Sequence, residues 1–195
     1  MATISKIPQE VNRYSIKRAI QIRHKNVEHL KLIKFERNEV WLETPFIKGT
    51  KNKVQLPVSQ PCYDILIHNH PDGFALPSYA DIVVALQLEM KKIFVSADGG
   101  FSSIDFTTAK KNMSNAQICN QAKVLEDVYT DAYFTEGPKF LLKNIINFLI
   151  LEPMLDSKSF DKACAAFCRR KIVDFARKTG VTFSEVKWND YARLD

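Results

Sequence analysis

The stretch DILIHNHPDGFALPSYADIVVAL, residues 64–86, decides how this chain folds. It begins with an apolar run at 64–67 that is typical of a short buried strand. This strand leads into the polar segment 68–70. Residues 77–78 are a helix start signal, and the apolar residues after them recur at helical spacing to about Met90. The stretch therefore predicts a buried strand, a loop and a helix.

Both flanks of this stretch carry the patterns of a mixed α/β sheet. Period-two alternation predicts strands, and the tight turns between them predict hairpins. The expected elements are a helix at 8–24, a hairpin of strands 27–35 and 39–47 around Arg37-Asn38, and a hairpin of strands 92–96 and 101–106 around 98–100.

From residue 107 the pattern changes to that of a largely helical half. We expect the α/β class, with a core domain at 1–106 and a helical region at 107–195 that can pack on the same core. The sequence gives this region no role. The elements expected in it are helices at 109–135, 138–151 and 157–178, and a strand at 181–188 after Gly180.

The composition is that of an ordinary globular protein. The 195 residues are 46% apolar and 26% charged, which excludes a disordered or fibrous chain. Neither the first twelve residues nor the interrupted apolar stretch 140–151 has the pattern of a secretory signal or a membrane span. We expect a soluble, cytoplasmic protein without membrane contact. Its cysteines form no C-x-x-C pair and are expected to be buried free thiols in a reducing compartment: Cys62, Cys119, Cys164 and Cys168.

Two histidines and an aspartate are placed to bind one metal ion. His68 and His70 are two residues apart on a strand, so their side chains point to the same face. Ser78 is expected to cap the following helix, with Asp81 in its first turn. There the helix dipole favours a carboxylate, which can be aimed back at the strand end. Two imidazoles and one carboxylate are a usual ligand set for catalytic zinc, which keeps a fourth position for water.

Each half of this pattern also has a purely structural explanation. Two histidines at a strand end can be satisfied by hydrogen bonds alone, and Ser78-x-x-Asp81 is a capping box with Asp in place of Glu. The two explanations are compatible, because a capping serine and a metal-binding aspartate can share one helical turn. Three other candidate ligands are expected to have other roles. His24, at a helix end, is expected to face solvent or to cap the helix, His29 is expected to be structural, and Cys62 is expected to be a buried thiol.

The spacing H-x-H-x7-S-x2-D resembles the signature of the JAMM (JAB/MPN) metalloprotease family, and the residues that fill it are His68, His70, Ser78 and Asp81. Pro71 after the second histidine also matches, as in bacterial and phage JAB domains. The resemblance covers roughly residues 27–106. It implies a JAB/MPN-like mixed sheet flanked by helices.

The resemblance also implies a chemistry. One Zn²⁺ per chain would be held by His68, His70, Asp81 and a water, and Ser78 would donate a hydrogen bond to the developing oxyanion. The implied substrate is a protein or peptide. The bond cut would be a peptide bond, or an isopeptide bond at the C-terminus of a ubiquitin-like protein.

The family needs an upstream glutamate as general base, and the resemblance implies Glu28. This residue stands after the first expected helix and directly before the first apolar strand, where the family carries its glutamate. Glu43, in the second expected strand, is the alternative. Glu36 and Glu39 flank a turn and are expected to be solvated. The upstream spacing varies in the family, so this assignment depends on position alone.

Two other classes of function stay open on the sequence. A non-catalytic JAB-fold interaction module would be expected to lack a ligand or the glutamate, whereas all four signature residues are present here. A DNA-associated JAB-like protein is the second alternative. The first 34 residues carry eight Lys or Arg against Glu10 and Glu28, and the net charge is +6, but no aromatic-interleaved nucleic-acid motif accompanies them.

Overall fold

The computed structural model of the protein describes residues 7–51, 53–56, 62–71, 74–128, 130–136, 138–139 and 157–191. Within these ranges the chain forms a seven-stranded sheet in the order β2-β1-β4-β5-β6-β7, with β3 also paired to β1. The strands are β1 (His29–Glu36), β2 (Glu39–Glu43), β3 (Ile47–Lys48), β4 (Ile65–Asn69), β5 (Lys92–Ala97), β6 (Gly100–Asp105) and β7 (Thr182–Lys187). The pair β4–β5 is parallel and the other pairs are antiparallel, so the sheet is mixed, as expected.

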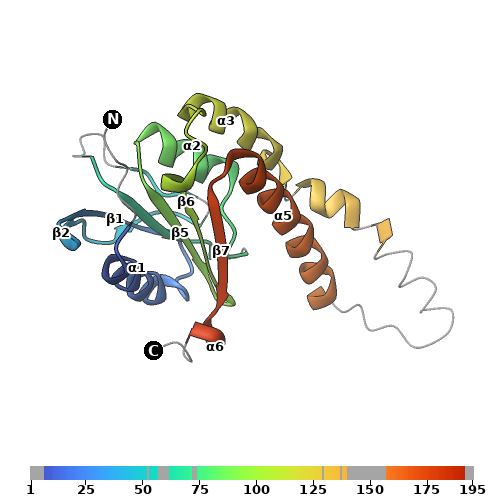
Figure 1. The fold of residues 1–195 in the computed structure, drawn as a ribbon. Coiled ribbons are helices and arrows are strands. Elements are labelled where there is room, and N and C mark those ends of the chain that lie inside the picture. The colour runs from blue at the N-terminus through green and yellow to red at the C-terminus, as the bar shows by residue number, and fades with distance from the viewer. Residues whose placement is uncertain are drawn as a thin grey trace.

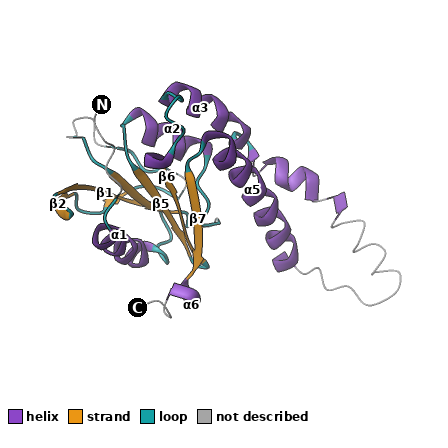
Figure 2. Cartoon of the chain, in the orientation of Figure 1, coloured by secondary structure: helices purple, strands orange, loops and turns teal. Residues whose placement is uncertain are grey.

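Helices cover both faces of this sheet (Figures 1 and 2). The helices with assigned bounds are α1 (Gln9–Ile22), α2 (Tyr79–Gln87), α3 (Asn115–Ala122), α5 (Ser157–Thr179) and α6 (Trp188–Tyr191). Helix α1 packs on one face against Ile65 and Ile67 of β4, whereas α2, α3 and α5 pack on the other face around Leu66. Because successive strand residues point to opposite faces, β4 contributes to both hydrophobic cores. No helix in the described part of the chain is both long and apolar enough to cross a lipid bilayer.

The connection from β4 to β5 places a helix start beside a strand end. These two strands are parallel neighbours, so the chain between them must return across the sheet, and α2 makes this crossing. The helix buries Ile82, Ala85 and Leu86 against the sheet. The first turn of α2 is therefore held near the carboxyl end of β4.

The elements expected in the N-terminal half are confirmed, with one change. At the predicted hairpin turn, Arg37 and Asn38 have φ angles of 48° and 73°, the left-handed backbone that a two-residue hairpin loop favours. The strand expected at 39–47 is divided into β2 and β3. The strand is interrupted at Pro45, which has no N–H to donate to a sheet. At the residue before it, the hydroxyl of Thr44 accepts the N–H of Leu32 in β1.

The single helix expected at 109–135 is wrong. The chain there forms α3, a 3-10 turn at Lys123–Leu125 and a separate helical segment at 130–136. Asp127 has a φ of 58°, and a left-handed residue interrupts a right-handed helix. Most of the helix expected at 138–151 lies outside the described residues.

The described C-terminal elements share the sheet and the core of the N-terminal ones. Strand β7, where the sequence predicts a terminal strand, pairs with β6 along all six residues of each. Helix α5 confirms the helix expected at 157–178. Its Cys168, Ile172 and Phe175 lie in the same hydrophobic cluster as Leu66 of β4. The last strand of the sheet is thus supplied from the region after residue 107.

The cysteines differ in exposure. Cys164 and Cys168 are buried in α5, but Cys62 is exposed, so the expectation of a buried thiol at Cys62 is wrong. It precedes the buried part of β4, where the chain is still outside the core. Burial raises the pKa of the Cys168 thiol to about 11, so this thiol stays protonated at neutral pH.

Gly100 tests how closely β7 is bound to β6. A Cβ atom added at Gly100 would overlap the carbonyl oxygen of Val186 in β7, whereas one added at Gly99 meets nothing within 4 Å. We expect Gly100→Ala to lower the free energy of unfolding by about 1–3 kcal/mol, because overpacking displaces the backbone. The matched variant Gly99→Ala should change it by less than about 0.5 kcal/mol. Urea unfolding measures both, and equal stability of the two variants would contradict this pairing.

Candidate metal centre

His68 and His70 lie at the end of β4 on the face that α2 covers. They follow Leu66 by two and four residues, and strand residues two apart share a face. The Nε2 atoms of the two histidines are 3.0 Å apart. Only 4% of the His68 side chain and 15% of the His70 side chain is exposed. The two imidazoles therefore meet at one largely buried point.

Asp81 reaches the same point from the first turn of α2. Its Oδ1 lies 3.2 Å from His68 Nε2, and its Oδ2 lies 3.5 Å from His70 Nε2. One ligand atom from each of the three side chains lies within 4.8 Å of the others. The predicted strand end and the predicted helix start are thus brought together.

Ser78, the N-cap of α2, fixes the Asp81 carboxylate. Asp81 Oδ2 accepts hydrogen bonds from both the backbone N–H and the hydroxyl of Ser78, each 2.7 Å long. The Asp81 N–H donates back to Ser78 Oγ over 3.2 Å, which completes a capping box. The capping role and the placement of a candidate metal ligand are therefore carried out by the same two residues.

Two imidazoles and a carboxylate are a donor set that zinc takes, and tetrahedral zinc bonds of about 2.0–2.1 Å put neighbouring ligand atoms about 3.3 Å apart. The two Nε2 atoms are 3.0 Å apart, but each lies nearest to a different oxygen of Asp81, His68 to Oδ1 at 3.2 Å and His70 to Oδ2 at 3.5 Å. A zinc ion bound through one Asp81 oxygen would therefore need a small adjustment of these side chains. His70 Nδ1 lies 3.1 Å from the Phe74 carbonyl, so the ring donates there and turns the Nε2 lone pair to the cluster. The buried His68 Nδ1 has no hydrogen-bond partner among the described residues. A carboxylate and imidazole lone pairs repel one another, so a proton or a metal cation has to lie among them.

Charge within the cluster shifts the pKa values of Asp81 and His70 toward their ionised forms. Burial alone raises the pKa of Asp81, but the charge and hydrogen bond of His68, and then those of His70, hold it well below its usual range. Burial lowers the pKa of His70, but the hydrogen bond and charge of Asp81 outweigh burial and raise it overall. Asp81 therefore stays ionised, and a cation that displaced the histidine protons would meet its negative charge.

Glu28 lies beside this cluster, directly before β1. Its half-buried carboxylate accepts the backbone N–H of Val54 and is within electrostatic reach of His68, His70 and Asp81. Burial raises the pKa of Glu28, the two histidines lower it and Asp81 raises it again, which leaves it above its ordinary value. A carboxylate of raised pKa beside a metal centre is suited to accept a proton from water.

Glu43, the alternative base, lies in an ion-pair network of its own. Its carboxylate accepts the Tyr14 hydroxyl at 2.7 Å and pairs with Arg18 at 3.0 Å and Lys31 at 3.2 Å. Burial raises the pKa of Glu43, but the hydrogen bonds and charges of these partners bring it below its ordinary value. Such a carboxylate is a poor proton acceptor.

The other histidines have partners away from the three ligands. The exposed His24 has its Nδ1 2.7 Å from the Asp98 carboxylate. His29 Nδ1 lies 3.0 Å from the Val27 carbonyl. The two glutamates that flank the hairpin turn are exposed, as expected.

Asn69, between the two histidines, is a candidate that the motif does not point to. It is fully buried, with 0% of its surface exposed, on the face of β4 opposite to the ligands. A signal for it was available in the sequence. A polar side chain facing the core from an apolar strand has to find hydrogen-bond partners.

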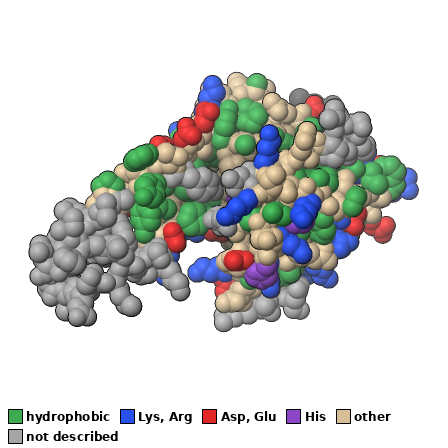
Figure 3. All heavy atoms as spheres, turned by 180° about the vertical axis from the view of Figure 1, so that it is seen from behind, with side chains coloured by type: hydrophobic (Ala, Val, Ile, Leu, Met, Phe, Trp, Pro, Cys, Tyr) green, Lys and Arg blue, Asp and Glu red, His purple; other side chains and the backbone are tan. Residues whose placement is uncertain are grey.

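The basic N-terminal segment does not present all of its charge to solvent. Arg18 and Lys31 pair with Glu43, and Lys34 lies over the Trp41 ring, with its Nζ 5.2 Å from the centroid. On the face drawn in Figure 3, Lys and Arg side chains lie among apolar and acidic ones. Part of the basic charge of this segment is therefore already paired and is not available to the phosphates of a nucleic acid.

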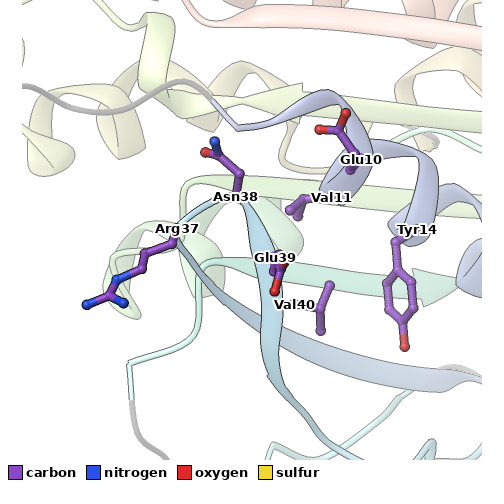
Figure 4. Close-up of a pocket in the computed structure, with 7 residues that line it drawn as sticks. All are labelled: Glu10, Val11, Tyr14, Arg37, Asn38, Glu39 and Val40. Atoms are coloured by element: carbon purple, nitrogen blue, oxygen red, sulfur yellow. The ribbon is translucent and has the colours of Figure 1, made fainter.

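A separate groove of about 540 Å³ lies between α1 and the hairpin of β1 and β2 (Figure 4). Val11 of α1 and Val40 of β2 line it, together with Glu10 and Glu39, and Arg37 points outward. None of the three candidate metal ligands lines it. The groove is thus distinct from the candidate metal centre.

Ser78→Ala tests two roles of this serine, the cap of α2 and the hydrogen bond that orients Asp81, because each role affects a different measured quantity. Loss of the cap should lower the free energy of unfolding by about 1 kcal/mol. Loss of the hydroxyl bond to Asp81 should also weaken zinc binding by about 10–100-fold, as is typical when a partner of a metal ligand is removed. Chemical unfolding and zinc titration measure the two effects.

Ser114 provides the matched control. It caps α3 through the same reciprocal bonds, with Gln117 in the place of Asp81. We expect Ser114→Ala to lose a similar amount of stability while zinc affinity is unchanged. If Ser78→Ala bound zinc as tightly as Ser114→Ala, the hydroxyl of Ser78 would have no part in holding Asp81 for a metal ion.

Comparisons with known proteins identify no relative of this chain. No family model, no curated protein and no solved structure matches the chain. What the candidate centre can do is therefore argued from its own residues and their geometry.

Proposed function

We propose that the protein is a zinc-dependent hydrolase of the JAMM type that cleaves a peptide or isopeptide bond. One observation carries the proposal. One ligand atom from each of His68, His70 and Asp81 lies within 4.8 Å of the others, and the carboxylate of Glu28 lies within electrostatic reach of them. Two imidazoles, a carboxylate ligand and a nearby free carboxylate are the parts that metal-assisted amide hydrolysis requires.

In this proposal three residues would hold the metal and one transfers protons. A zinc ion held by His68, His70 and Asp81 would lower the pKa of a water molecule and polarise the carbonyl to be attacked. Glu28 takes a proton from the attacking water. It then passes the proton to the nitrogen of the leaving amine when the amide bond breaks. A carboxylate suits both steps, because it can first accept and then release the proton.

Ser78 has a second proposed role as donor to the oxyanion. A serine hydroxyl carries a single hydrogen, and here that hydrogen is given to Asp81 Oδ2. An oxyanion beside the metal would compete for it. The hydroxyl would turn to the oxyanion, while the backbone N–H of Ser78 keeps its own bond to Asp81. Such a donor is worth on the order of 3 kcal/mol of transition-state stabilisation.

The proposed substrate class follows from the resemblance of the motif to JAMM proteases. It is an amide in a protein or peptide, including an isopeptide bond at the C-terminus of a ubiquitin-like protein. A library of internally quenched peptides, together with peptides joined through a lysine side chain, would separate the two kinds of bond.

Zinc content tests the ligand set. The wild-type chain should bind about one zinc, because three ligands and a water complete a tetrahedral site. His68→Ala/His70→Ala should bind none, and circular dichroism should show the fold largely kept, because the core does not depend on the metal. His24→Ala/His29→Ala removes two histidines outside the cluster and should bind zinc normally. Stoichiometric zinc in the first double variant would refute the assignment.

Glu28→Gln tests the general base. The amide cannot accept the proton, so we expect hydrolysis to fall by about 10²–10⁴-fold while zinc content is unchanged. The measurement is kcat/KM on the peptide that the wild type cleaves fastest. Glu43→Gln is the control, and it should lose stability with its ion pairs but keep its turnover. Near-normal turnover of Glu28→Gln together with an inactive Glu43→Gln would transfer the role to Glu43.

A further inference from the structure

Asn69 occupies the point where the backbone pairing of β1 and β4 ends. The antiparallel ladder between these strands runs from Ile33–Ile65 to Leu30–His68 and stops there. Beyond it lie Glu28 on one strand and His70 on the other. The proposed base and the second histidine therefore both lie beyond the paired part of the two strands. Backbone hydrogen bonds between β1 and β4 do not hold these two residues in place relative to each other.

The Asn69 side chain takes the place of the missing backbone bonds. Its Oδ1 accepts the His29 N–H over 2.7 Å. Its Nδ2 donates to the carbonyls of Val27, over 3.2 Å, and Lys25, over 3.3 Å. Two of these groups belong to the residues immediately before and after Glu28.

A second set of bonds holds Glu28 from its other side. The Glu28 N–H donates to the Thr50 carbonyl, and the Glu28 carbonyl accepts the Gly49 N–H, each over 2.8 Å. The backbone of Glu28 is thus fixed between the 49–50 segment and Asn69. Of these contacts, those of Asn69 connect it directly to the strand that carries the histidines.

The chemistry of this position suits asparagine closely. Both donor hydrogens of the amide are used, and its oxygen accepts one bond, which makes three of the four hydrogen bonds that a primary amide can form. Aspartate would place a second acceptor against two carbonyls, and serine would offer one donor hydrogen. A buried polar side chain that is hydrogen-bonded in this way holds its neighbours in one arrangement.

We propose that Asn69 is a positioning residue that sets the Glu28 carboxylate relative to the metal ligands His68 and His70. The inference rests on the proposed function, because it assigns Asn69 a part in the same hydrolysis. Asn69 itself touches neither substrate nor metal. Its side chain ties the 25–29 segment to the end of β4 that carries the two histidines, so that the base and the ligands keep one geometry.

The test compares Asn69→Leu with Thr44→Val. Both variants replace a buried hydrogen-bonding side chain by an apolar one of similar size. Thr44 accepts the Leu32 N–H of the same strand β1, away from Glu28. Amide hydrogen exchange of the full chain should rise at residues 25–29 in Asn69→Leu and stay as in the wild type there in Thr44→Val. If Asn69→Leu does not fold, Asn69→Ala replaces it in the same hydrogen-exchange comparison.

A double-mutant cycle then connects this segment to catalysis. With the peptide that the wild type cleaves fastest, Asn69→Leu should lower kcat by about 10²-fold, as expected for a misplaced group. KM and zinc content should change little. In the Glu28→Gln background, Asn69→Leu should cost less than about threefold more, because the group that it positions is already gone. A residue that only stabilised the fold would lower both backgrounds equally.

The outcomes separate the two claims. Unchanged exchange at 25–29, or additive losses in the cycle with an active wild type, would overturn the inference and leave the proposed hydrolase intact. A wild-type chain that takes up zinc but cleaves none of the peptides would overturn the proposed function and this inference together. Raised exchange with non-additive losses is the result that the inference predicts.

Discussion

The candidate metal centre depends on one electrostatic constraint, the meeting of two imidazole nitrogens and a carboxylate in a largely buried place. Burial would normally drive the pKa of Asp81 up, and instead it is held well below its usual range by His68 and His70. A negative charge in such a place needs a positive partner. A proton shared with the histidines compensates the negative charge of Asp81 in part, and a divalent cation would compensate it fully.

The rest of the fold serves to bring these three side chains together. Strand β4 is buried on both faces, so its end cannot move without disturbing both cores. Because its parallel neighbour requires a crossing connection, α2 must begin close to that end. The capping box of Ser78 then decides which way the Asp81 carboxylate points. Each step constrains the next, and the cluster is the result.

Local patterns made the ligand cluster predictable, whereas contacts distant in sequence were not. The period of two places His68 and His70 on one face, and a capping serine with an acid three residues later marks the start of α2. Glu28 was a weaker prediction, because its approach depends on how β1 pairs with β4. The bonds of Asn69 to residues 40 or more positions earlier in the chain follow from that same pairing. The helix expected at 109–135 was wrong because apolar periodicity does not reveal the left-handed residue Asp127.

The central claim is that this cluster binds zinc through two imidazoles and a carboxylate, and X-ray absorption of the zinc-loaded full chain tests it most directly. The account predicts a four-coordinate shell of nitrogen and oxygen at about 2.0–2.1 Å, with the outer-shell scattering of two imidazoles. Sulfur scattering at about 2.3 Å would point to a cysteine site instead. A shell without imidazole scattering, or no zinc in the chain, would contradict the claim outright.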